Sequence, residues 1–383
     1  MDIKDYTFIV FCEEHHYNPL GVVRSLGEYG IHPSVVGYGG GVHVVCKSKY
    51  VKEAHHVKTV EQGYKLILEK FKNPKQKVFI ITCDDRTTQY LDERYDELKD
   101  YFYFNNAGKN GRVTYYMDKN NINVLAEKYG LKVPKAYVVK KGEVREDIEY
   151  PVITKAITSN TGAWKKDVFV CQNAEELKAA YGKIKSDTLL LQHYIEKTNE
   201  LCIDGFSVSQ GKDVFFAISS LYNYNIPGKY AFDYTSQNPK DKNLTDILSA
   251  MMREIGFEGI FSIEFLIDKR QEKYFMEINF RNSTWSYTAT KAGMNLPVNW
   301  AKGMIYNKIP DSIYQPIREG GIRTLAEFDD FKTRVAGKKI GIREWFRIAR
   351  KADCLLFYNK EDNKPFWISF FDKFNRFKRL KRK

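Results

Sequence analysis

Short apolar segments alternate with amphipathic ones along the first part of the chain. Three mostly apolar runs have the length of buried strands: 7–13, 33–39 and 77–85. Stretches with helical spacing accompany them: 20–29, 61–71 and 88–99. Strands that alternate with helices form parallel βαβ units. The pattern therefore predicts an open α/β domain, to which we assign residues 1–115.

Acidic residues follow two of these strands. Glu13 and Glu14 stand at the end of the first, and Asp84 and Asp85 stand at the end of the third. In open parallel sheets, ligands bind at the carboxyl ends of the strands. We therefore expect these side chains to lie on the ligand side of the domain.

A second unit begins with a well-marked helix. Asp118 is a suitable N-cap, the helical pattern runs to Lys128, and Gly130 and Pro134 follow as stop signals. A helix near 174–184 and six further strands are predicted after it, at 150–156, 167–172, 189–196, 214–221, 260–267 and 274–280. We assign 116–310 to this second domain and 311–383 to a helical, aromatic C-terminal extension.

Composition indicates the class of protein and its cellular location. Hydrophobic residues make up 43% and charged residues 28% of the chain, as in soluble globular proteins. The six cysteines form no CxxC pair, so neither a disulfide framework nor a zinc site is expected. We find no signal-peptide pattern and no apolar stretch of about 20 residues that could cross a bilayer. The expected location is the cytoplasm, with the inner face of the cell membrane as an open alternative.

The net charge of +13 is concentrated at one end of the chain. Residues 366–383 contain seven Lys or Arg and one Asp. Nucleic acid, anionic lipid and phosphorylated substrates are all attracted to basic surfaces, so the total charge alone does not distinguish among them. We expect small-molecule substrates and no nucleic acid.

The tail has a helical pattern that suggests contact with a membrane. Aromatic residues recur on one predicted face: Trp367, Phe370, Phe371, Phe374 and Phe377. Basic residues occupy the remainder: Lys373, Arg376, Lys378, Arg379 and Lys381. Such a helix can lie among the headgroups of an anionic membrane. The alternative is that the aromatic rings pack on the protein and the basic groups are solvated.

Two glycine-rich patterns and two histidine pairs are poor candidates for sites. The run from Gly37 to Val42 lacks the third glycine of a dinucleotide fingerprint, and Cys46 stands where a P-loop needs glycine. A plain loop is the favoured interpretation. The pairs His15-His16 and His55-His56 have no third ligand at metal-binding spacing, so loop or surface histidines are favoured there.

The strongest chemical signal is a predicted hairpin at 256–282. Glu277 and Asn279 are two residues apart, so a strand directs both side chains to one face, and Glu264 can join them from the partner strand. Two carboxylates and an amide oxygen are the hard ligands that Mg²⁺ prefers. Arg281 continues along this face and can stabilise a transferring phosphoryl group. The alternative is an edge hairpin with one solvated polar face.

Two further stretches suit a nucleotide. Lys155 ends a strand and is followed by a small polar loop with Gly162, which is a suitable cradle for phosphates. Residues 189–206 form an apolar strand that runs into a polar linker containing Glu196 and Glu200. Apolar groups and exposed backbone there suit adenine, and a glutamate suits ribose hydroxyls.

Taken together, these stretches resemble the ATP-grasp superfamily over roughly residues 1–310. The resemblance implies an N-terminal open parallel α/β domain followed by a two-part ATP-grasp fold, with ATP and Mg²⁺ as cofactors. It implies that ATP is bound by Lys119, Lys155, Thr161, Gly162, Gln192, Tyr194, Ile195, Glu200 and Lys229. The implied metal ligands are Glu264, Glu277 and Asn279, with Arg281 as the catalytic arginine. The loop over 159–166 is the expected lid.

Three other stretches resemble a narrower branch, the carboxylate–amine ligases that include bacterial D-aspartate ligase. They are 18–31, 277–297 and 359–366. The implied reaction forms an acyl phosphate on an amino acid's carboxylate and couples it to an amine, with a cell-envelope precursor such as a peptidoglycan stem peptide as acceptor. A homodimer is an open alternative to a monomer, because dimers are common among these enzymes.

Two other functions remain open. One is an ATP-grasp carboxylase or carbamoyl-phosphate-type enzyme that activates bicarbonate, which is disfavoured because the sequence contains no glutaminase or biotin-carrier module. The other is a nucleotide-binding regulator without catalysis, which is disfavoured because the acidic pair, Asn279 and Arg281 are all present.

Overall fold

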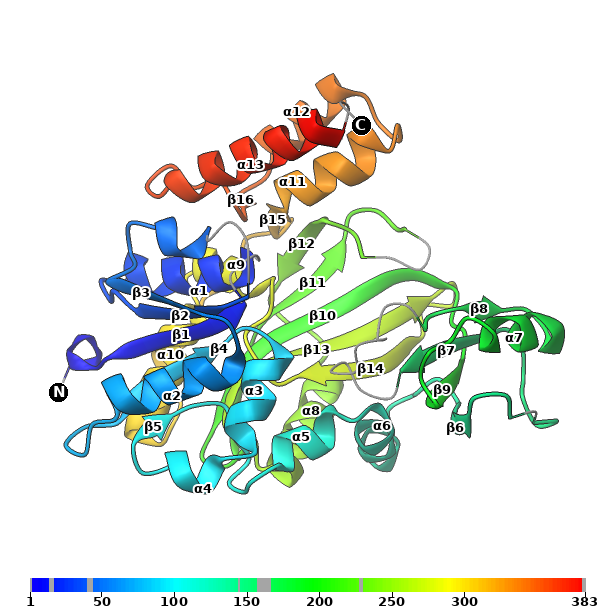
Figure 1. Ribbon diagram of the computed structural model, residues 1–383, viewed down its shortest axis with the longest axis horizontal. Coiled ribbons are helices and arrows are strands. Elements are labelled where there is room, and N and C mark those ends of the chain that lie inside the picture. Colours follow the sequence, from blue (N-terminus) through cyan, green and yellow to red (C-terminus); the bar gives the residue numbers. More distant parts are fainter. Residues whose placement is uncertain are drawn as a thin grey trace.

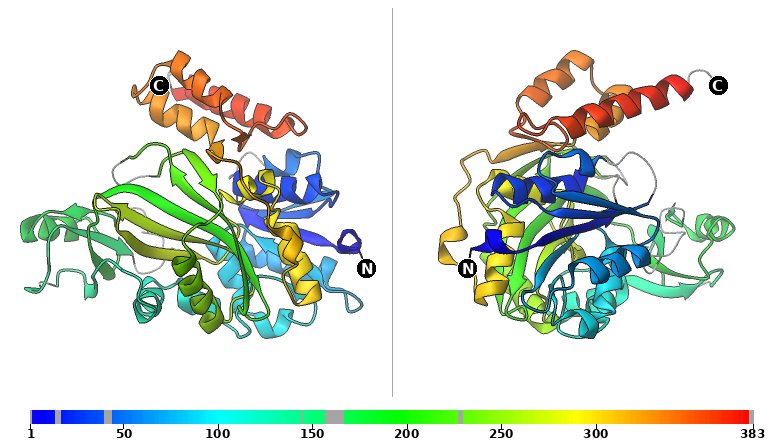
Figure 2. Two further views of the ribbon diagram at one scale, coloured as in Figure 1. Left: turned by 180° about the vertical axis from the view of Figure 1, so that it is seen from behind. Right: turned by 60° about the vertical axis from the view of Figure 1, so that its left-hand side comes forward.

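The computed structural model describes residues 2–13, 17–39, 44–143, 145–156, 167–226 and 230–380. Its strands form three sheets, and a set of C-terminal helices packs beside them as a further layer (Figures 1 and 2). The three sheets differ in strand direction and in what covers them, so each is taken in turn.

The first sheet is parallel and has the order β3-β2-β1-β4-β5. Its strands are β1 (Phe8–Glu13), β2 (Ser34–Tyr38), β3 (Glu53–Val57), β4 (Val78–Thr82) and β5 (Phe102–Tyr103). Its helices are α1 (Tyr17–Glu28), α2 (Val60–Phe71), α3 (Asp85–Asp92) and α4 (Tyr95–Leu98). Phe8, Val10 and Cys12 pack in one cluster with α1, whereas Ile9 and Phe11 pack in another with α2. Both faces are therefore covered, which explains the uninterrupted apolar runs.

The predicted α/β domain is confirmed as a parallel sheet, with two differences. The edge strand β3 was not predicted, because its sequence EAHHV has no apolar run and its residues are only partly buried. The single helix expected at 88–99 is two short helices, α3 and α4. Asp84 caps α3 by accepting a hydrogen bond from the Thr87 amide, and its side chain also accepts from the Glu13 amide.

A small antiparallel sheet follows, with the order β6-β9-β7-β8. Two helices lead into it, α5 (Arg112–Met117) and α6 (Lys119–Lys128). Its strands and their helix are β6 (Ala136–Lys140), β7 (Val152–Ala156), β8 (Val170–Cys171), α7 (Ala174–Tyr181) and β9 (Thr188–His193). Asp118 caps α6 as predicted, because its side chain accepts from the amides of Asn120 and Asn121.

The largest sheet has the order β14-β13-β10-β11-β12-β15-β16. Its strands are β10 (Lys197–Val208), β11 (Asp213–Tyr222), β12 (Asp233–Gln237), β13 (Gly259–Asp268), β14 (Lys273–Asn279), β15 (Ile322–Leu325) and β16 (Cys354–Leu355). Its helices are α8 (Lys242–Ile255), α9 (Ser286–Lys291) and α10 (Leu296–Tyr306). The polar linker expected after residue 196 is wrong: that segment is β10, which lies between β11 and β13. Glu200 therefore lies on a rigid central strand.

The C-terminal part is more than a helical extension. Strands β15 and β16 extend the large sheet, and the helices follow: α11 (Glu327–Asp330), a π-helical turn (Phe331–Ala336), α12 (Ile342–Arg350) and α13 (Lys364–Leu380). Short 3₁₀ turns occur at Ile3–Asp5, Val45–Lys47 and Asp311–Ile313. All six cysteines are free, as expected. None of the helices in the described ranges is both long and apolar enough to cross a bilayer.

A buried ion pair attaches the C-terminal part to the first sheet. Arg24 of α1 donates to Asp362 Oδ2 at 3.0 Å and to the carbonyl groups of Leu356 and Phe357, and its side chain is fully buried. Asp362 also accepts from the Ser48 hydroxyl and the Lys49 amide. A buried charge pair needs this many partners to offset its desolvation.

We expect Arg24→Met to lower the free energy of unfolding by about 3–5 kcal/mol, because it leaves the buried Asp362 carboxylate without a counter-charge. Urea unfolding of the purified protein measures this change. Lys49→Met is the matched control, since it removes the exposed partner of Glu361 at 3.9 Å and should cost less than about 1 kcal/mol. Equal losses in the two variants would contradict a structural role for the Arg24–Asp362 pair.

Candidate functional site

The β13–β14 hairpin places two glutamates opposite each other. Glu264 pairs with Glu277 in the strand register, and Ser262 pairs with Asn279. The Asn279 amide nitrogen donates to Glu264 Oε1 at 2.9 Å. The three side chains predicted to share one face of the hairpin therefore do so. The register shifts just after Glu264, and such irregularities often occur beside functional sites.

Lys119, the first residue of α6, supplies a counter-charge. Its ammonium group lies 2.5 Å from Glu277 Oε2. A positive charge in the first turn of a helix opposes the helix dipole, so local helix energetics do not favour a lysine there. The ion pair with the Glu277 carboxylate on β14 explains why a lysine stands at this position. The positive charge of Lys119 makes the largest contribution to lowering the pKa of Glu277.

Arg281 joins the hairpin to the first sheet. Its guanidinium donates to Asn279 Oδ1 at 2.9 Å and to Asp85 Oδ1 at 2.8 Å. Asp85 is the first residue of α3, directly after β4. It lies at the carboxyl end of that strand, where the sequence pattern predicted a ligand to bind. The structure thus brings the start of α3 into contact with Arg281, which follows the hairpin. Sequence reasoning placed Asp85 at this edge but did not include it in the site.

Lys155 lies on the small sheet and faces the same region. Its ammonium group donates to Gln192 Oε1 at 2.6 Å, and Gln192 is buried on β9. Burial and the neighbouring charge of Lys119 lower the pKa of Lys155 to about 7. Two lysines held close together in a partly desolvated site favour an anionic ligand that can compensate both.

Glu200 is buried on β10 and contacts the Lys197 ammonium group. Burial raises the pKa of Glu200, and Lys197 opposes that change. Sequence reasoning missed Lys197, which is three residues before Glu200 in a segment interpreted as a linker. Glu196, the other candidate glutamate in that segment, is exposed.

The connection after β9 offers polar backbone groups. The Tyr194 amide donates to the Pro151 carbonyl group at 2.8 Å, whereas Ile195 forms no backbone hydrogen bond with any other described residue. Ile195 is nevertheless buried. An amide and a carbonyl group of this kind, beside apolar side chains, are typical of a site for a flat heteroaromatic ring.

Two cavities meet at the hairpin. The first, of about 490 Å³, lies between the small and the large sheet, and Lys155, Gln192, Tyr194, Ile195, Glu200, Leu266 and Met276 contribute to its walls. The second, of about 530 Å³, passes Asp85 and Arg281 and reaches α1, α11 and α13. Both are lined by Lys119, Tyr230, Glu264 and Glu277. The predicted site residues that the structure describes therefore all lie on these cavities, and the shared residues mark their junction.

The donor set at this junction fits a divalent cation. Burial, together with the nearby charge of Glu277, raises the pKa of Glu264 well above its usual range. A positive ion between the two carboxylates would relieve that cost. Asn279 Oδ1, which accepts from Arg281, has a second lone pair for the ion. In the described part of the chain no three His, Cys, Asp or Glu residues cluster as a metal site, so the predicted third ligand here would be the Asn279 amide oxygen.

The remaining residues considered in the sequence analysis are not part of the described site. His55 and His56 lie on β3 and belong to no metal-binding group of described residues. Thr161, Gly162 and Lys229, the expected lid over 159–166, the pair His15-His16 and residues 40–43 of the glycine-rich run fall outside the described residues. Their predicted roles stay predictions.

Comparison with known proteins identifies the fold. Residues 124–290 match the family model of the ATP-grasp domain. L-amino acid ligase from Bacillus licheniformis has a similar structure, with 13% identity and a TM-score of 0.61 over 82% of this chain and 78% of that one. N5-carboxyaminoimidazole synthetase from Staphylococcus aureus, complexed with ADP, gives 14% identity and a TM-score of 0.61 over 79% and 78%.

A carboxylase structure matches equally well. The biotin carboxylase domain of 2-oxoglutarate carboxylase from Hydrogenobacter thermophilus, a dimer complexed with MgADP, ADP and bicarbonate, gives 17% identity and a TM-score of 0.61 over 80% of this chain and 71% of that one. Identities this low establish the fold alone. Residues 124–290 match the ATP-grasp domain model and a parallel α/β sheet precedes them, so the chain has the fold expected from the sequence.

Proposed function

We propose that the protein is an ATP-dependent ligase that activates a carboxylate as an acyl phosphate and couples it to an amine. One observation carries the proposal: the half-buried Glu264–Glu277 pair lies at the junction of two cavities, with Lys119, Lys155 and Arg281 around it. One cavity suits a nucleotide, and the other suits the molecules that react with it.

Each group then has a defined task. Glu264, Glu277 and Asn279 would hold Mg²⁺, and Lys119 and Lys155 would hold the phosphates. The bound metal and nucleotide supply charge neutralisation and the phosphoryl group that makes a carboxylate a competent acylating agent. Arg281, fixed by Asp85 and Asn279, is placed to stabilise negative charge on the reacting carboxyl group. Gln192, Tyr194, Ile195 and Glu200 would bind adenosine.

The comparisons support an ATP-grasp fold but leave the choice of substrate open between ligases and carboxylases. We favour amide formation over bicarbonate activation because the second cavity, at about 530 Å³, is large for bicarbonate and is lined by both charged and aromatic groups. Within the ligases, kinship with the D-aspartate ligase branch and a cell-envelope acceptor remain our interpretation of the sequence.

The direct test is ATP turnover with a panel of L- and D-amino acids, and separately with bicarbonate, followed by product analysis. We expect ADP release that depends on amino acids and an amide product. Glu277→Gln should reduce that turnover on the order of 100-fold or more, because it removes a charge that would hold the metal. Glu272→Gln, at the turn of the same hairpin, is the matched control, since Glu272 pairs with the exposed Lys132 at 2.5 Å.

Three results would count against this assignment. Bicarbonate-dependent turnover without amide formation would favour the carboxylase alternative. Nucleotide binding without turnover under any condition would favour a non-catalytic regulator. Unchanged turnover in Glu277→Gln would remove Glu277 from the site.

Lys155 generates a prediction about protons. Its pKa of about 7 in the free protein means that it is mostly neutral at pH 8. A polyphosphate favours the charged form, so ATP binding should raise this pKa and take up a proton at pH 8. Below about pH 6 the lysine is already charged and the uptake should vanish. Calorimetry of ATP binding without divalent ions, in two buffers of different ionisation enthalpy, measures the number of protons.

Lys155→Met should abolish this proton uptake and weaken ATP binding by about tenfold or more, as expected for loss of a hydrogen bond to a charged group. Lys135→Met is the control, because Lys135 is exposed and pairs with Glu149 at 3.4 Å. Proton uptake that persists in Lys155→Met would assign the titration to another group.

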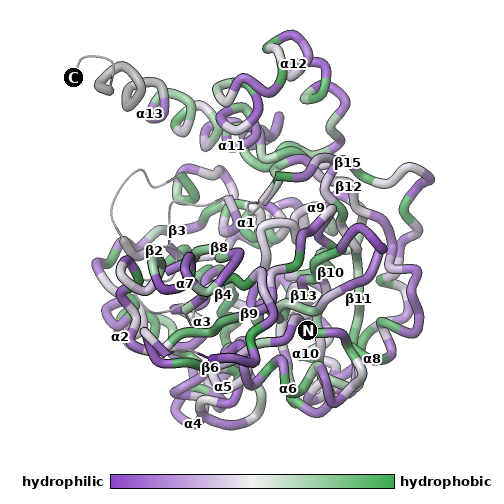
Figure 3. The backbone as a smooth tube through the Cα atoms, turned by 90° about the vertical axis from the view of Figure 1, so that its right-hand side faces the viewer, coloured by the Kyte–Doolittle hydropathy of each residue, from purple (hydrophilic) through white to green (hydrophobic). Residues whose placement is uncertain are grey.

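We also propose that α13 contacts an anionic membrane. Trp367, Phe370 and Phe371 are 46%, 41% and 56% exposed, whereas Phe366 stacks on Phe328 with 5.1 Å between ring centroids. Hydrophobic and hydrophilic residues alternate along the part of this helix that Figure 3 colours. One side thus anchors the helix while the other presents aromatic rings near a strongly basic terminus. A lipid-linked or envelope-bound acceptor would make such contact useful.

Trp367→Ser/Phe371→Ser should reduce co-sedimentation with anionic liposomes by about tenfold or more, because each large apolar side chain contributes about 1.5–3 kcal/mol when buried. Binding of the wild-type protein should also weaken as salt rises. Tyr306→Ser/Tyr314→Ser is the matched control, since these tyrosines are 59% and 52% exposed elsewhere. Equal binding of both variants at low and physiological salt would reject membrane contact through α13.

A further inference from the structure

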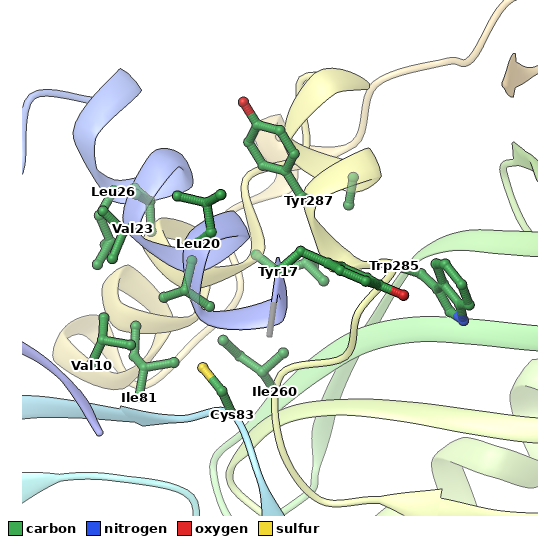
Figure 4. Packing of buried hydrophobic residues seen from close by; sticks show 14 of the residues in the cluster. Val10, Tyr17, Leu20, Val23, Leu26, Ile81, Cys83, Ile260, Trp285 and Tyr287 are labelled. Carbon is green, nitrogen blue, oxygen red and sulfur yellow. The ribbon is translucent and has the colours of Figure 1, made fainter. Parts of the chain in front are cut away.

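The outer end of the 530 Å³ cavity is built from parts of the chain that are distant in sequence. Tyr17 of α1, Asp329 of α11, Phe357 after β16 and Lys373 of α13 line it, together with Trp285. Tyr17 and Phe357 meet edge to face at 5.3 Å between centroids. Figure 4 shows the Tyr17 ring directed away from Leu20 and Val23 and toward Trp285. The proposed nucleotide site uses none of these residues.

Asp329 has a carboxylate without a partner among the described residues, since it forms no hydrogen bond or ion pair with any of them. Its neighbour Asp330 differs, because it accepts from Arg334, from the Trp345 indole at 2.8 Å and from the Tyr224 hydroxyl at 2.8 Å. Burial raises the pKa of Asp329, and the charge of Lys373 opposes that change. A carboxylate left unpaired at a cavity wall is suited to a cationic ligand group.

Lys373 provides the opposite charge on the facing helix. Its ammonium group lies 5.2 Å from the Phe328 ring centroid and 5.8 Å from the Phe357 ring centroid. It forms no ion pair with a described residue, and in particular none with Asp329. A carboxylate and an ammonium group that line one cavity without bonding to each other leave room for a ligand that meets both.

We propose that this end of the cavity is the subsite for the amine substrate, and that the substrate is an amino acid or a similar zwitterion. Asp329 binds its ammonium group and Lys373 binds its anionic group, while Tyr17 and Phe357 enclose its apolar part. This inference rests on the proposed ligase function and adds the class of acceptor.

The layout of the two cavities supports an amine subsite at this end of the 530 Å³ cavity. The nucleotide cavity and the acceptor cavity share Lys119, Tyr230, Glu264 and Glu277, where the phosphoryl group would be transferred. Arg281 lies on the acceptor cavity alone. A second substrate that meets an acyl phosphate beside Arg281 must therefore occupy the part of the cavity that the nucleotide does not share, and Asp329 and Lys373 line that part.

Two half-reactions test the assignment separately. Hydroxylamine captures an acyl phosphate as a hydroxamate, and it is uncharged at neutral pH, so it does not need Asp329. Each variant is assayed for hydroxamate formation from ATP, an amino acid and hydroxylamine. It is then assayed for amide formation with free L- and D-amino acids, including the diamine L-lysine, as acceptors.

In Asp329→Asn we expect KM for the acceptor to rise about 10–100-fold, as for loss of a hydrogen bond between charged groups, with hydroxamate formation unchanged. Lys373→Met should behave in the same way for acceptors that carry a carboxylate, and Asp329→Glu should restore part of the affinity. Glu344→Gln and Lys360→Met, which are exposed and line neither cavity, are the matched controls. Equal thermal unfolding midpoints verify that the variants fold.

The outcomes separate the two proposals. Hydroxamate formation with an unchanged acceptor KM in Asp329→Asn overturns the subsite alone. Hydroxamate formation without an amide from any free amino acid, in the wild-type protein, overturns the assignment of a free zwitterion. Absence of hydroxamate in the wild-type protein overturns the ligase function and the subsite with it.

Discussion

The arrangement of this molecule depends on two half-buried glutamates that face each other across a hairpin. Glu264 and Glu277 occupy paired positions on β13 and β14, where two like charges would be costly to bury without compensation. The compensation comes from other parts of the chain: Lys119 from the start of α6, and Arg281, which is itself held by Asp85 at the edge of the first sheet. The hairpin, the helix that leads to the small sheet and the parallel sheet therefore meet at one point, because each contributes a charge that the others need.

This compensation is incomplete without a ligand, in a way that suits catalysis. Burial and the charge of Lys119 lower the pKa of Lys155, while burial and the charge of Glu277 raise the pKa of Glu264. A polyphosphate would satisfy the lysines and a divalent cation would satisfy the glutamates, so the two would stabilise each other's site. Binding energy of this kind is available to orient the substrates, because the protein groups are already fixed by Gln192, Asn279 and Asp85.

The sequence was informative where the signal was local and failed where partners are distant. Glu277 and Asn279 could be placed on one face because strands alternate, and the start of α6 followed from the cap at Asp118. Strand β10 was missed because it begins with polar residues and contains Asp204, whose partners Ser283 and Ser286 are about 80 positions away. Edge strand β3 was missed because its side chains are only partly buried. The 530 Å³ cavity could not be predicted, since the helices that line its far end, α1, α11 and α13, are far apart in sequence.

The same distant contacts explain why the C-terminal part belongs to the site. Arg24 holds the backbone at Leu356 and Phe357, and Glu327 accepts from the amides of Phe357 and Tyr358. These bonds hold the 356–358 segment against α11. On α11, Phe328 stacks on Phe366 of α13, and this contact positions α13 and Lys373. One helix thereby carries a cavity-lining ammonium group and an exposed aromatic side. If that side rests on a membrane, the same helix places the acceptor subsite beside the membrane surface, because Lys373 and the exposed aromatic rings lie on one continuous helix.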